Sequence, residues 1–417
     1  MSEATVATRA VRVPLEVPFF RPELTETEIA GVVECLRSGW LTTGPRVRTF
    51  EEQFARAVGA RYAVAVNSCT AALHLALEAM GLRPGQGVLV PTMTFAATAE
   101  VARYLGAIPI LVDCDRHTTN MDLSDAERKL EAARKGTLLP GLGPLDVVGL
   151  MPVYVGGLMM EIGELQEFAA RHSLWLVEDA AHAFPAAWRK DAGAPWQRCG
   201  ERTATVSCFS FYANKTITTG EGGMAVTDAP ELADRMRTMS LHGLSHDAWG
   251  RYSGRGSWDY CILAPGYKYN LTDIAAALGI AQLARAEEMR VRRHTLAQQY
   301  LHELAAVHAI ELPPEGENRI HAWHLFPIRL RTECLRISRE QFIEELRSRG
   351  VASSVHWRPL HFHTYYQQTF GWSPESFPVA SQVWQTLVSL PLFPAMRDEE
   401  QAHVIGCVRD ICAAFSH

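Results

Sequence analysis

The chain has 417 residues, and at roughly 150 residues per domain this length predicts two or three domains, of which we expect two of unequal size. Apolar residues make up 47% of the sequence and charged residues 21%, a composition typical of a globular protein and too apolar for a disordered one. The formal charge of −6 (40 − 46) without a dense Lys/Arg run argues against a nucleic-acid partner, and the lack of a membrane-spanning or signal-peptide pattern predicts a cytoplasmic protein.

The first expected helix follows Thr25, where Thr25 and Glu28 form a capping box and an apolar face follows. Residues 1 to about 13 show no periodicity and are expected to be a tail. The members of the apolar face are Ile29, Val32, Val33 and Leu36.

Short apolar strands alternate with amphipathic helices from Tyr62 to about Thr227. This alternation predicts right-handed βαβ units and a mostly parallel sheet with helices on both faces. The expected strands are Val88 to Val90, Ile108 to Val112, Val147 to Val153, Leu174 to Val177, Thr203 to Phe211 and Gly223 to Val226.

A long helical region from Ile274 to about Leu304 is expected to lead into a second, smaller α+β domain. That domain is predicted to contain a strand from Trp323 to Leu330, a helix capped by Ser338 and Gln341, and a strand from Val351 to His356. The predicted division is an N-terminal segment, a large domain and a small domain over residues 1–24, 25–280 and 281–417.

Nine cysteines are scattered along the chain without a CxxC pair or a tight Cys/His cluster. We therefore expect no metal site. An odd number of cysteines in a long chain fits reduced thiols better than a disulfide framework.

The sequence around Lys215 is the sharpest local feature. It reads SFYANKTITTGEGG from Ser210, a strand end that leads through the lysine into a glycine-rich turn. Partial desolvation at such a place would lower the pKa of the lysine and leave a neutral amine for imine formation. A lone loop lysine is more often a surface residue, and the apolar, Ser/Thr-rich surroundings favour the first interpretation without deciding it.

Asp179 ends the apolar run LWLVED. Ligands of α/β sheets bind outside the carboxyl ends of the strands, so this carboxylate is placed to face a site. A buried carboxylate needs a cationic partner, which a protonated pyridine nitrogen would supply. The alternative is that Asp179 caps a following helix, and the residues alone leave both interpretations open.

A polar turn, NSCTAAL from Asn67, opens a helix. Its free backbone N–H groups and the hydroxyls of Ser68 and Thr70 predict an anion site suited to a phosphate, although Ser and Thr are also the usual helix caps. Phe95, in PTMTF after the next strand, lies where its ring could either stack on a flat heterocycle or pack in the core.

Taken in order, these motifs resemble the DegT/DnrJ/EryC1/StrS family of sugar aminotransferases, which depend on pyridoxal 5′-phosphate (PLP) and have the aspartate-aminotransferase fold (fold type I). The resemblance extends from GWLTTGP at residues 39–45 to SLPLFP at residues 389–394. It implies an α/β fold with a large domain built on a mostly parallel central sheet flanked by helices, a smaller C-terminal α+β domain, and PLP as the cofactor.

The resemblance also implies roles for single residues. Lys215 matches the family's Schiff-base lysine, Asp179 the aspartate that pairs with the pyridine nitrogen, and His182 the Gln or His beside the cofactor's phenolic oxygen. Further implied cofactor contacts are the phosphate-binding Ser210, the turn residues Ser68, Cys69 and Thr70, the stacking ring of Phe95, and Lys268 and Asn270 of the segment PGYKYN. Implied acceptor contacts are Thr43, His242, His356 and His361, together with Lys268 and Asn270.

Three positions depart from the family pattern. Cys69 stands where many members have glycine, which is tolerable if only its backbone N–H is used. Tyr154 replaces a common histidine, and Lys268 replaces an asparagine offered to the phosphate across the dimer. Relatives that dehydrate deoxysugars carry histidine in place of the Schiff-base lysine, whereas this chain retains Lys215.

Family membership would suggest transfer of an amino group from an amino acid, L-glutamate as the expected donor, to a keto group of a nucleotide-linked deoxy-sugar. The segment around Lys268 looks like one that reaches into a neighbouring subunit, so a homodimer with shared sites is expected. The alternatives are an acceptor such as a cyclitol or an aromatic amino-acid precursor, or a PLP-binding regulator without turnover. The implied partners are small molecules, with no nucleic acid and no membrane.

Overall fold

The computed structural model describes residues 15–245 and 260–417, so the expected tail at residues 1 to about 13 lies outside the described residues. The α-helices are α1 (Glu26–Ser38), α2 (Pro45–Val58), α3 (Cys69–Ala79), α4 (Ala97–Tyr104), α5 (Leu123–Lys135), α6 (Ile162–His172), α7 (Pro230–Ser240), α8 (Asp273–Ala284), α9 (Ala286–Leu304), α10 (Arg339–Ser348), α11 (Thr364–Phe370), α12 (Pro378–Thr386) and α13 (Asp398–Ala414). The strands are β1 (Tyr62–Val66), β2 (Gly87–Pro91), β3 (Ile108–Val112), β4 (Val147–Leu150), β5 (Trp175–Asp179), β6 (Ala187–Trp188), β7 (Gln197–Arg198), β8 (Val206–Ser210), β9 (Gly223–Thr227), β10 (Ile310–Glu311), β11 (Arg319–Ile320), β12 (Phe326–Leu330) and β13 (Leu387–Leu390).

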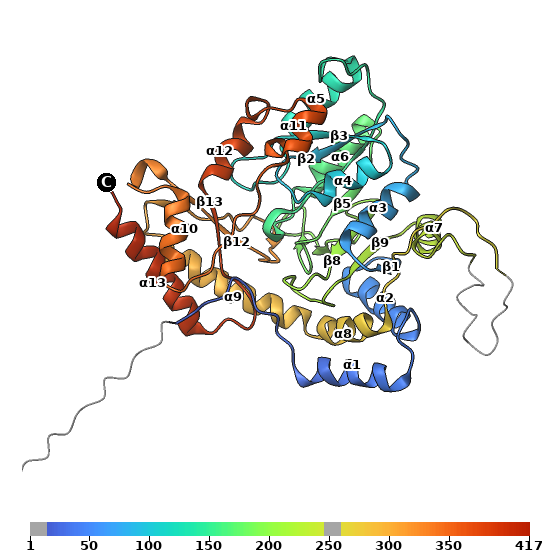
Figure 1. The fold of residues 1–417 in the computed structure, drawn as a ribbon, viewed down its shortest axis with the longest axis horizontal. Helices are drawn as coiled ribbons and strands as arrows, with labels where there is room; N and C mark the ends of the chain where they lie inside the picture. The colour runs from blue at the N-terminus through green and yellow to red at the C-terminus, as the bar shows by residue number, and fades with distance from the viewer. Residues whose placement is uncertain (1–14, 246–259) are drawn as a thin grey trace, which may run out of the picture.

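A seven-stranded sheet with the order β1-β9-β8-β5-β4-β2-β3 forms the centre of the molecule (Figure 1). The pairs between β3, β2, β4, β5 and β8 are parallel, whereas β9 runs antiparallel to both β8 and β1. The expected mostly parallel sheet flanked by helices is confirmed. Its parallel strands carry their carboxyl ends to one edge, where ligands of such sheets bind.

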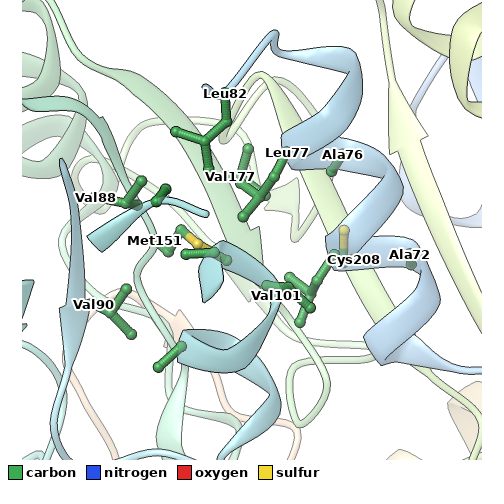
Figure 2. Close-up of a cluster of buried hydrophobic side chains, with 14 of the residues drawn as sticks. Ala72, Ala76, Leu77, Leu82, Val88, Val90, Val101, Met151, Val177 and Cys208 are labelled. Carbon is green, nitrogen blue, oxygen red and sulfur yellow. The ribbon is translucent and has the colours of Figure 1, made fainter. Parts of the chain in front are cut away.

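The main core lies between the sheet and the helices α3 and α4. Figure 2 shows Ala72, Ala76 and Leu77 of α3 facing the strand residues Val88 and Val177. All five side chains are buried, because strands covered on both faces are apolar along their whole length and the helix turns its own apolar side toward them.

A second core belongs to the C-terminal part of the chain. The antiparallel sheet β10-β12-β13 is packed with α9, α10 and α13 around Phe326, Phe342 and Val408. In Figure 1, α8 and α9 follow one another from the side of α1 and α2 to these C-terminal elements. The three domain ranges expected from the sequence stay a prediction.

The structure corrects the limits of several expected elements. Residues 351–356 do not form a strand, since only single bridges join Val351 to Val17 and Ser354 to Ser389. The strand expected from Trp323 begins at Phe326, because Trp323 has a φ of 49° in the left-handed region, outside the range of a strand. Apolar character alone does not separate a strand from a buried irregular segment.

Three further expectations change in detail. The strand expected to run from residue 147 to 153 ends at Leu150, and the helical region expected from residue 274 to 304 divides into α8 and α9 at Arg285. The capping box at Thr25 is present, but α1 turns the buried Glu28 and Cys35 toward the body of the protein and leaves Ile29 and Leu36 half exposed, at 50% and 51%. The buried carboxylate of Glu28 is tolerated there because Gln282 and Arg285 donate hydrogen bonds to it.

Residues 186–200 form a small β-hairpin. Strands β6 and β7 pair with each other, and β6 also pairs with β11, so the hairpin is tied to residues 319–320. Within the part of the chain that the structure describes, no helix combines the length and apolarity needed to cross a membrane.

A substitution at Gly149 of β4 measures how tightly β4 packs against Trp175. A Cβ atom there would lie 2.2 Å from the Trp175 ring, so Gly149→Ala is expected to destabilise the apo protein by about 1–3 kcal/mol through overpacking. The matched control is Gly163→Ala in α6, where a Cβ atom meets no neighbour within 4 Å and alanine is expected to stabilise by about 0.5–1 kcal/mol. Thermal unfolding should shift in opposite directions for the two variants, and equal shifts would contradict this packing.

Candidate active site

Strand ends bring the predicted cofactor residues together at one edge of the large sheet. Asp179 ends β5, Ser210 ends the neighbouring β8, and Gly223 begins β9, where it pairs with Ser210 and with Val66 of β1. A Cβ atom on Gly223 would lie 2.4 Å from the carbonyl carbon and oxygen of Ser68. Only glycine therefore lets the turn after β1 pack here, with Ser68 and Ser210 both adjoining residue 223.

The turn at Ser68 opens α3 as expected, and Ser68 Oγ accepts a hydrogen bond from the Ala71 backbone N–H at 3.1 Å. Within the described residues, the backbone N–H groups of Cys69 and Thr70 donate to no protein acceptor, as usual in the first turn of a helix. Burial raises the pKa of the Cys69 thiol well above its usual range, and Asp179 adds to this rise, so the thiol stays neutral. The turn thus has free donors and no thiolate to repel a phosphate.

Asp179 is 5% exposed, and both oxygens of its carboxylate accept hydrogen bonds. Oδ2 accepts from the Thr98 hydroxyl at 2.7 Å and Oδ1 from the Ala181 backbone N–H at 3.1 Å. Burial raises the pKa of Asp179, while these hydrogen bonds and the charge of Lys215 act in the opposite direction. No helix follows Asp179 before β6, so the helix-cap alternative is wrong. No side chain in the described ranges forms an ion pair with it, which leaves the carboxylate suited to a cationic ring nitrogen.

Lys215 lies in the connection between β8 and β9 and is partly buried. Burial lowers its pKa from the usual 10.5 to about 8; Arg293 adds to the lowering, and Cys69 and Asp179 oppose it. A small pocket beside Lys215 is lined by Ser210, His182 and other residues. The surface-lysine alternative is therefore wrong, and the amine is easier to deprotonate than that of an exposed lysine.

Histidines and a tryptophan line the other side of Lys215. The ring of His182 stacks on Trp357 at 5.0 Å between centroids and lies 4.1 Å from the ring of His324. Burial lowers the pKa of His182 and His324 well below the usual range and that of His356 to about 4, and the charge of Lys215 adds to each effect. These imidazoles are neutral at pH 7 and can donate or accept a proton in a hydrogen bond without adding charge.

Phe95 is 62% exposed, so its ring is open to a ligand rather than packed in the core. The turn that carries it is anchored at Thr92, whose Oγ1 lies 2.8 Å from Nδ1 of His361. His361 was expected to contact the acceptor, and this expectation is wrong. It is 0% exposed, and its second ring nitrogen bonds Ser381 Oγ at 2.9 Å, so both nitrogens serve the packing between the two parts of the chain.

The remaining expected contacts lie beside the end of β1. The Thr43 hydroxyl donates to the Leu271 carbonyl at 2.6 Å and accepts from Asn270 Nδ2 at 2.7 Å. The backbone of Asn270 also forms an isolated β-bridge with that of Val66. His242 and Lys268 are exposed, and the backbone of Lys268 bridges Leu241 next to His242. Their roles as cofactor or acceptor contacts stay predictions.

Several residues near the site were missed from the sequence. Tyr154, noted only as a departure from histidine, donates a hydrogen bond to the buried carboxylate of Glu178. The hydroxyls of Ser207 and Thr203 donate to the same carboxylate at 2.6 and 2.8 Å. These hydroxyls satisfy Glu178 on the opposite face of β5 from Asp179. Thr98, His324 and Trp357 were also missed, and only the pairing of Thr94 and Thr98 at a spacing of four had a local signal.

The residues present therefore fit PLP: a helix N-terminus with hydroxyls for its phosphate, a carboxylate for its ring nitrogen, an exposed aromatic ring and a partly buried amine. The sequence model of the DegT/DnrJ/EryC1/StrS aminotransferase family matches residues 22–409. The chain belongs to this family.

Its relatives agree with that assignment. SpsC, a spore coat polysaccharide biosynthesis protein of Bacillus subtilis, is 40% identical over 396 residues, which cover 95% of this chain and 97% of SpsC. The PLP form of Spr1654 from Streptococcus pneumoniae is 30% identical with a TM-score of 0.84, covering 96% of this chain and 99% of that one. The sugar aminotransferase CalS13 from Micromonospora echinospora is 27% identical with a TM-score of 0.80, covering 94% and 99%.

This member of the DegT/DnrJ/EryC1/StrS family is a PLP-dependent aminotransferase of fold type I. The large parallel sheet supplies the strand ends that carry Asp179 and Ser210, as this fold requires of its cofactor site.

The lowered pKa of Lys215 can be measured on the apo protein. With a pKa of about 8, roughly one amine in ten is neutral at pH 7, against about one in 2,500 for a free lysine of pKa about 10.4. Acetylation of Lys215, quantified by mass spectrometry of its peptide, is expected to rise with a midpoint near pH 8, two units below that of added N-acetyl-lysine amide. In Asp179→Asn the midpoint should move lower, because the carboxylate raises this pKa. Coincident profiles for Lys215 and the free lysine would contradict the desolvated amine.

Proposed function

We propose that this aminotransferase moves an amino group from L-glutamate to a keto group of a nucleotide-linked deoxy-sugar. The observation that carries the proposal is the partly buried amine of Lys215 near the buried carboxylate of Asp179, which forms no ion pair among the described residues. The chain is similar to proteins of polysaccharide and sugar metabolism. The donor and the nucleotide come from the resemblance described above.

Each residue then has a chemical role. PLP, when bound, supplies the electron sink for charge that develops at the donor's α-carbon. Asp179 pairs with the ring nitrogen and favours its protonated form, since an ion pair in a dry site stabilises both charged partners. Lys215 is the residue that would hold the cofactor covalently through its amine, and the same amine, when free, would move a proton at the donor's α-carbon. Ser68, Thr70, Ser210 and the backbone of Cys69 bind the phosphate.

The aromatic groups around Lys215 orient the ring and exclude water. Phe95, whose ring is 62% exposed, would stack on one face of the cofactor, and His182 would lie beside its phenolic oxygen. Because burial keeps His182 neutral, it contributes a hydrogen bond there rather than a second positive charge next to Lys215. The acceptor contacts proposed from the resemblance are Thr43, which accepts a hydrogen bond from Asn270, and the histidines His356 and His242, of which His242 is exposed.

Two half-reactions test the function. The PLP-loaded protein is incubated with L-glutamate, and 2-oxoglutarate is measured with a coupled dehydrogenase; one equivalent per site is expected. Addition of a nucleoside diphosphate 4-keto-6-deoxyhexose should then give an amino sugar, detected by mass spectrometry. Lys215→Ala is expected to lower turnover by at least about 10³-fold, since covalent and acid–base catalysis are lost together.

Lys135→Ala is the matched control, because Lys135 is an exposed lysine of α5 that pairs with Glu131. Its turnover should equal that of the wild type. If the protein aminates a keto-inositol in preference to every nucleotide sugar tested, the acceptor is a cyclitol and the proposed nucleotide-sugar acceptor is wrong. Failure to form 2-oxoglutarate with intact PLP binding would favour the non-catalytic regulator.

We further propose a homodimer in which Lys268 reaches the neighbouring subunit's site. Within a single chain, α1 exposes Ile29 and Leu36, and Ile262 and Leu263 are 69% and 63% exposed a few residues before Lys268. Adjacent exposed apolar side chains such as Ile262 and Leu263 are typical of a protein interface. An interface there would cover them and bring Lys268 to the partner.

A mixed dimer tests this sharing. Lys215→Ala and Lys268→Ala chains, unfolded together and refolded in equal amounts, form mixed dimers in which one site receives Lys215 from one chain and Lys268 from the other. About a quarter of the wild-type activity is expected, since half of the dimers are mixed and each has one intact site. Refolding each variant alone is the control. No recovery on mixing would place Lys268 in its own chain's site, and full activity of Lys268→Ala refolded alone would place it outside both sites.

A further inference from the structure

Two buried threonine hydroxyls lead to the carboxylate of Asp179. Thr98, in the first turn of α4, donates from Oγ1 to Asp179 Oδ2 at 2.7 Å, and Thr94 Oγ1 lies 2.7 Å from Thr98 Oγ1. Thr98 is 0% exposed and Thr94 1%. Both belong to the same turn as Phe95, so one segment carries the ring expected to stack on the cofactor and the hydroxyls that reach the carboxylate behind it.

The direction of these hydrogen bonds follows from proton counting. An ionised carboxylate can only accept, so the single proton of the Thr98 hydroxyl must point to Asp179. Thr98 Oγ1 then has only lone pairs left for Thr94, and the Thr94 hydroxyl must donate to it. A second arrangement exists, because Thr98 Oγ1 also lies 3.3 Å from the Phe95 carbonyl oxygen. The negative charge on Asp179 favours the arrangement in which the Thr98 hydroxyl donates to Asp179, and a hydrogen bond donated by Thr94 to Thr98 Oγ1 supports it.

The carboxylate accepts one hydrogen bond on each oxygen and retains acceptor capacity for a ligand. Oδ2 receives Thr98 and Oδ1 receives the Ala181 backbone N–H at 3.1 Å. Each oxygen keeps a lone pair for a further donor. With one oxygen held by a backbone group and the other by Thr98, loss of the hydroxyl would leave the carboxylate free to rotate about its last bond.

We propose that Thr98, with its hydroxyl directed by Thr94, is a positioning residue that keeps the carboxylate of Asp179 ionised and oriented toward the ring nitrogen of PLP. The proposal rests on the proposed role of Asp179. It adds a hydroxyl relay from α4 to that role.

The hydrogen bond from Thr98 also opposes the rise that burial causes in the pKa of Asp179. Burial raises the pKa of Asp179, and among the interactions that lower this pKa the hydrogen bond from Thr98 is the largest. A protonated Asp179 has no charge to offer a pyridinium. Removal of the hydroxyl should therefore weaken the pairing most at low pH.

The test compares PLP with 1-deazapyridoxal 5′-phosphate, in which a C–H group replaces the ring nitrogen. The dissociation constants of both from the apo protein are measured by equilibrium dialysis, and their ratio reports the nitrogen's interaction without substrate or turnover. Thr98→Val, which keeps the shape and removes the hydroxyl, is expected to weaken PLP binding about tenfold and binding of the analogue less than about twofold. Thr94→Val should act in the same direction but less, and Thr98→Ser should restore the ratio.

The pH dependence adds a second readout. The preference for PLP over the analogue should disappear as pH falls and Asp179 is protonated, and in Thr98→Val this loss should occur at a higher pH than in the wild type. Thr227→Val is the matched control: its hydroxyl is buried and bonds the Thr205 carbonyl at 2.7 Å, at the opposite end of β9 from Gly223. It should leave the ratio and its pH dependence unchanged.

The outcomes separate the inference from the assignment of Asp179. If Asp179→Asn abolishes the preference for PLP and Thr98→Val leaves it intact, Thr98 has no positioning role and Asp179 keeps its own. If Thr98→Val weakens the binding of PLP and of the analogue equally, Thr98 only shapes the turn, and the inference fails. If the wild type itself shows no preference, Asp179 is not the partner of the ring nitrogen.

Discussion

The site depends on two ionisable groups, the amine of Lys215 and the carboxylate of Asp179, that share one poorly solvated edge of the sheet. Burial acts on the two pKa values in opposite directions, lowering that of Lys215 to about 8 and raising that of Asp179, so each group alone would tend to become neutral. Their mutual attraction and the hydrogen bonds from Thr98 and Ala181 oppose this tendency. A bound cationic ring adds a partner for the carboxylate, while a less basic lysine can give up its proton at ordinary pH.

The C-terminal part of the chain completes this environment. His324, Trp357 and His356 come from segments more than a hundred residues after Lys215, yet the rings of His324 and Trp357 lie against His182, and the charge of Lys215 lowers the pKa of His324 and His356. The segment that carries His324 is held by Arg293 of α9, whose Nη1 donates to the carbonyls of Trp323, His324 and Leu392 at 3.1, 3.3 and 2.8 Å. The same guanidinium helps to lower the pKa of Lys215. A buried cation that fixes the second half of the chain thus also affects the chemistry of the first.

Local patterns predicted the central sheet well, because strands buried on both faces are short, apolar and bounded by turns. β3 was placed to the residue, and the caps at Thr25 and Ser338 were both found. The failures have a common cause. Residues 351–356 are apolar enough for a strand, but whether such a segment pairs along its length or by single bridges depends on its neighbours, here Val17 and Ser389. A similar case is the face of α1 that carries Ile29 and Leu36, which the described part of the chain leaves half exposed.

For the site, the sequence singled out Lys215, Asp179 and the turn at Ser68 because each follows a strand or opens a helix, and the family resemblance added their roles and that of Ser210. These positions follow from local rules, because parallel strands bring their carboxyl ends to one edge. Only the tertiary structure decided the roles of residues that act through distant partners. His361 resembled a ligand contact in the sequence, but both of its nitrogens bond side chains of the protein, and Thr98, which the sequence did not single out, reaches Asp179 across 81 residues of chain. A hydrogen bond needs two groups within about 3 Å, and no local pattern states which remote segment will supply the second.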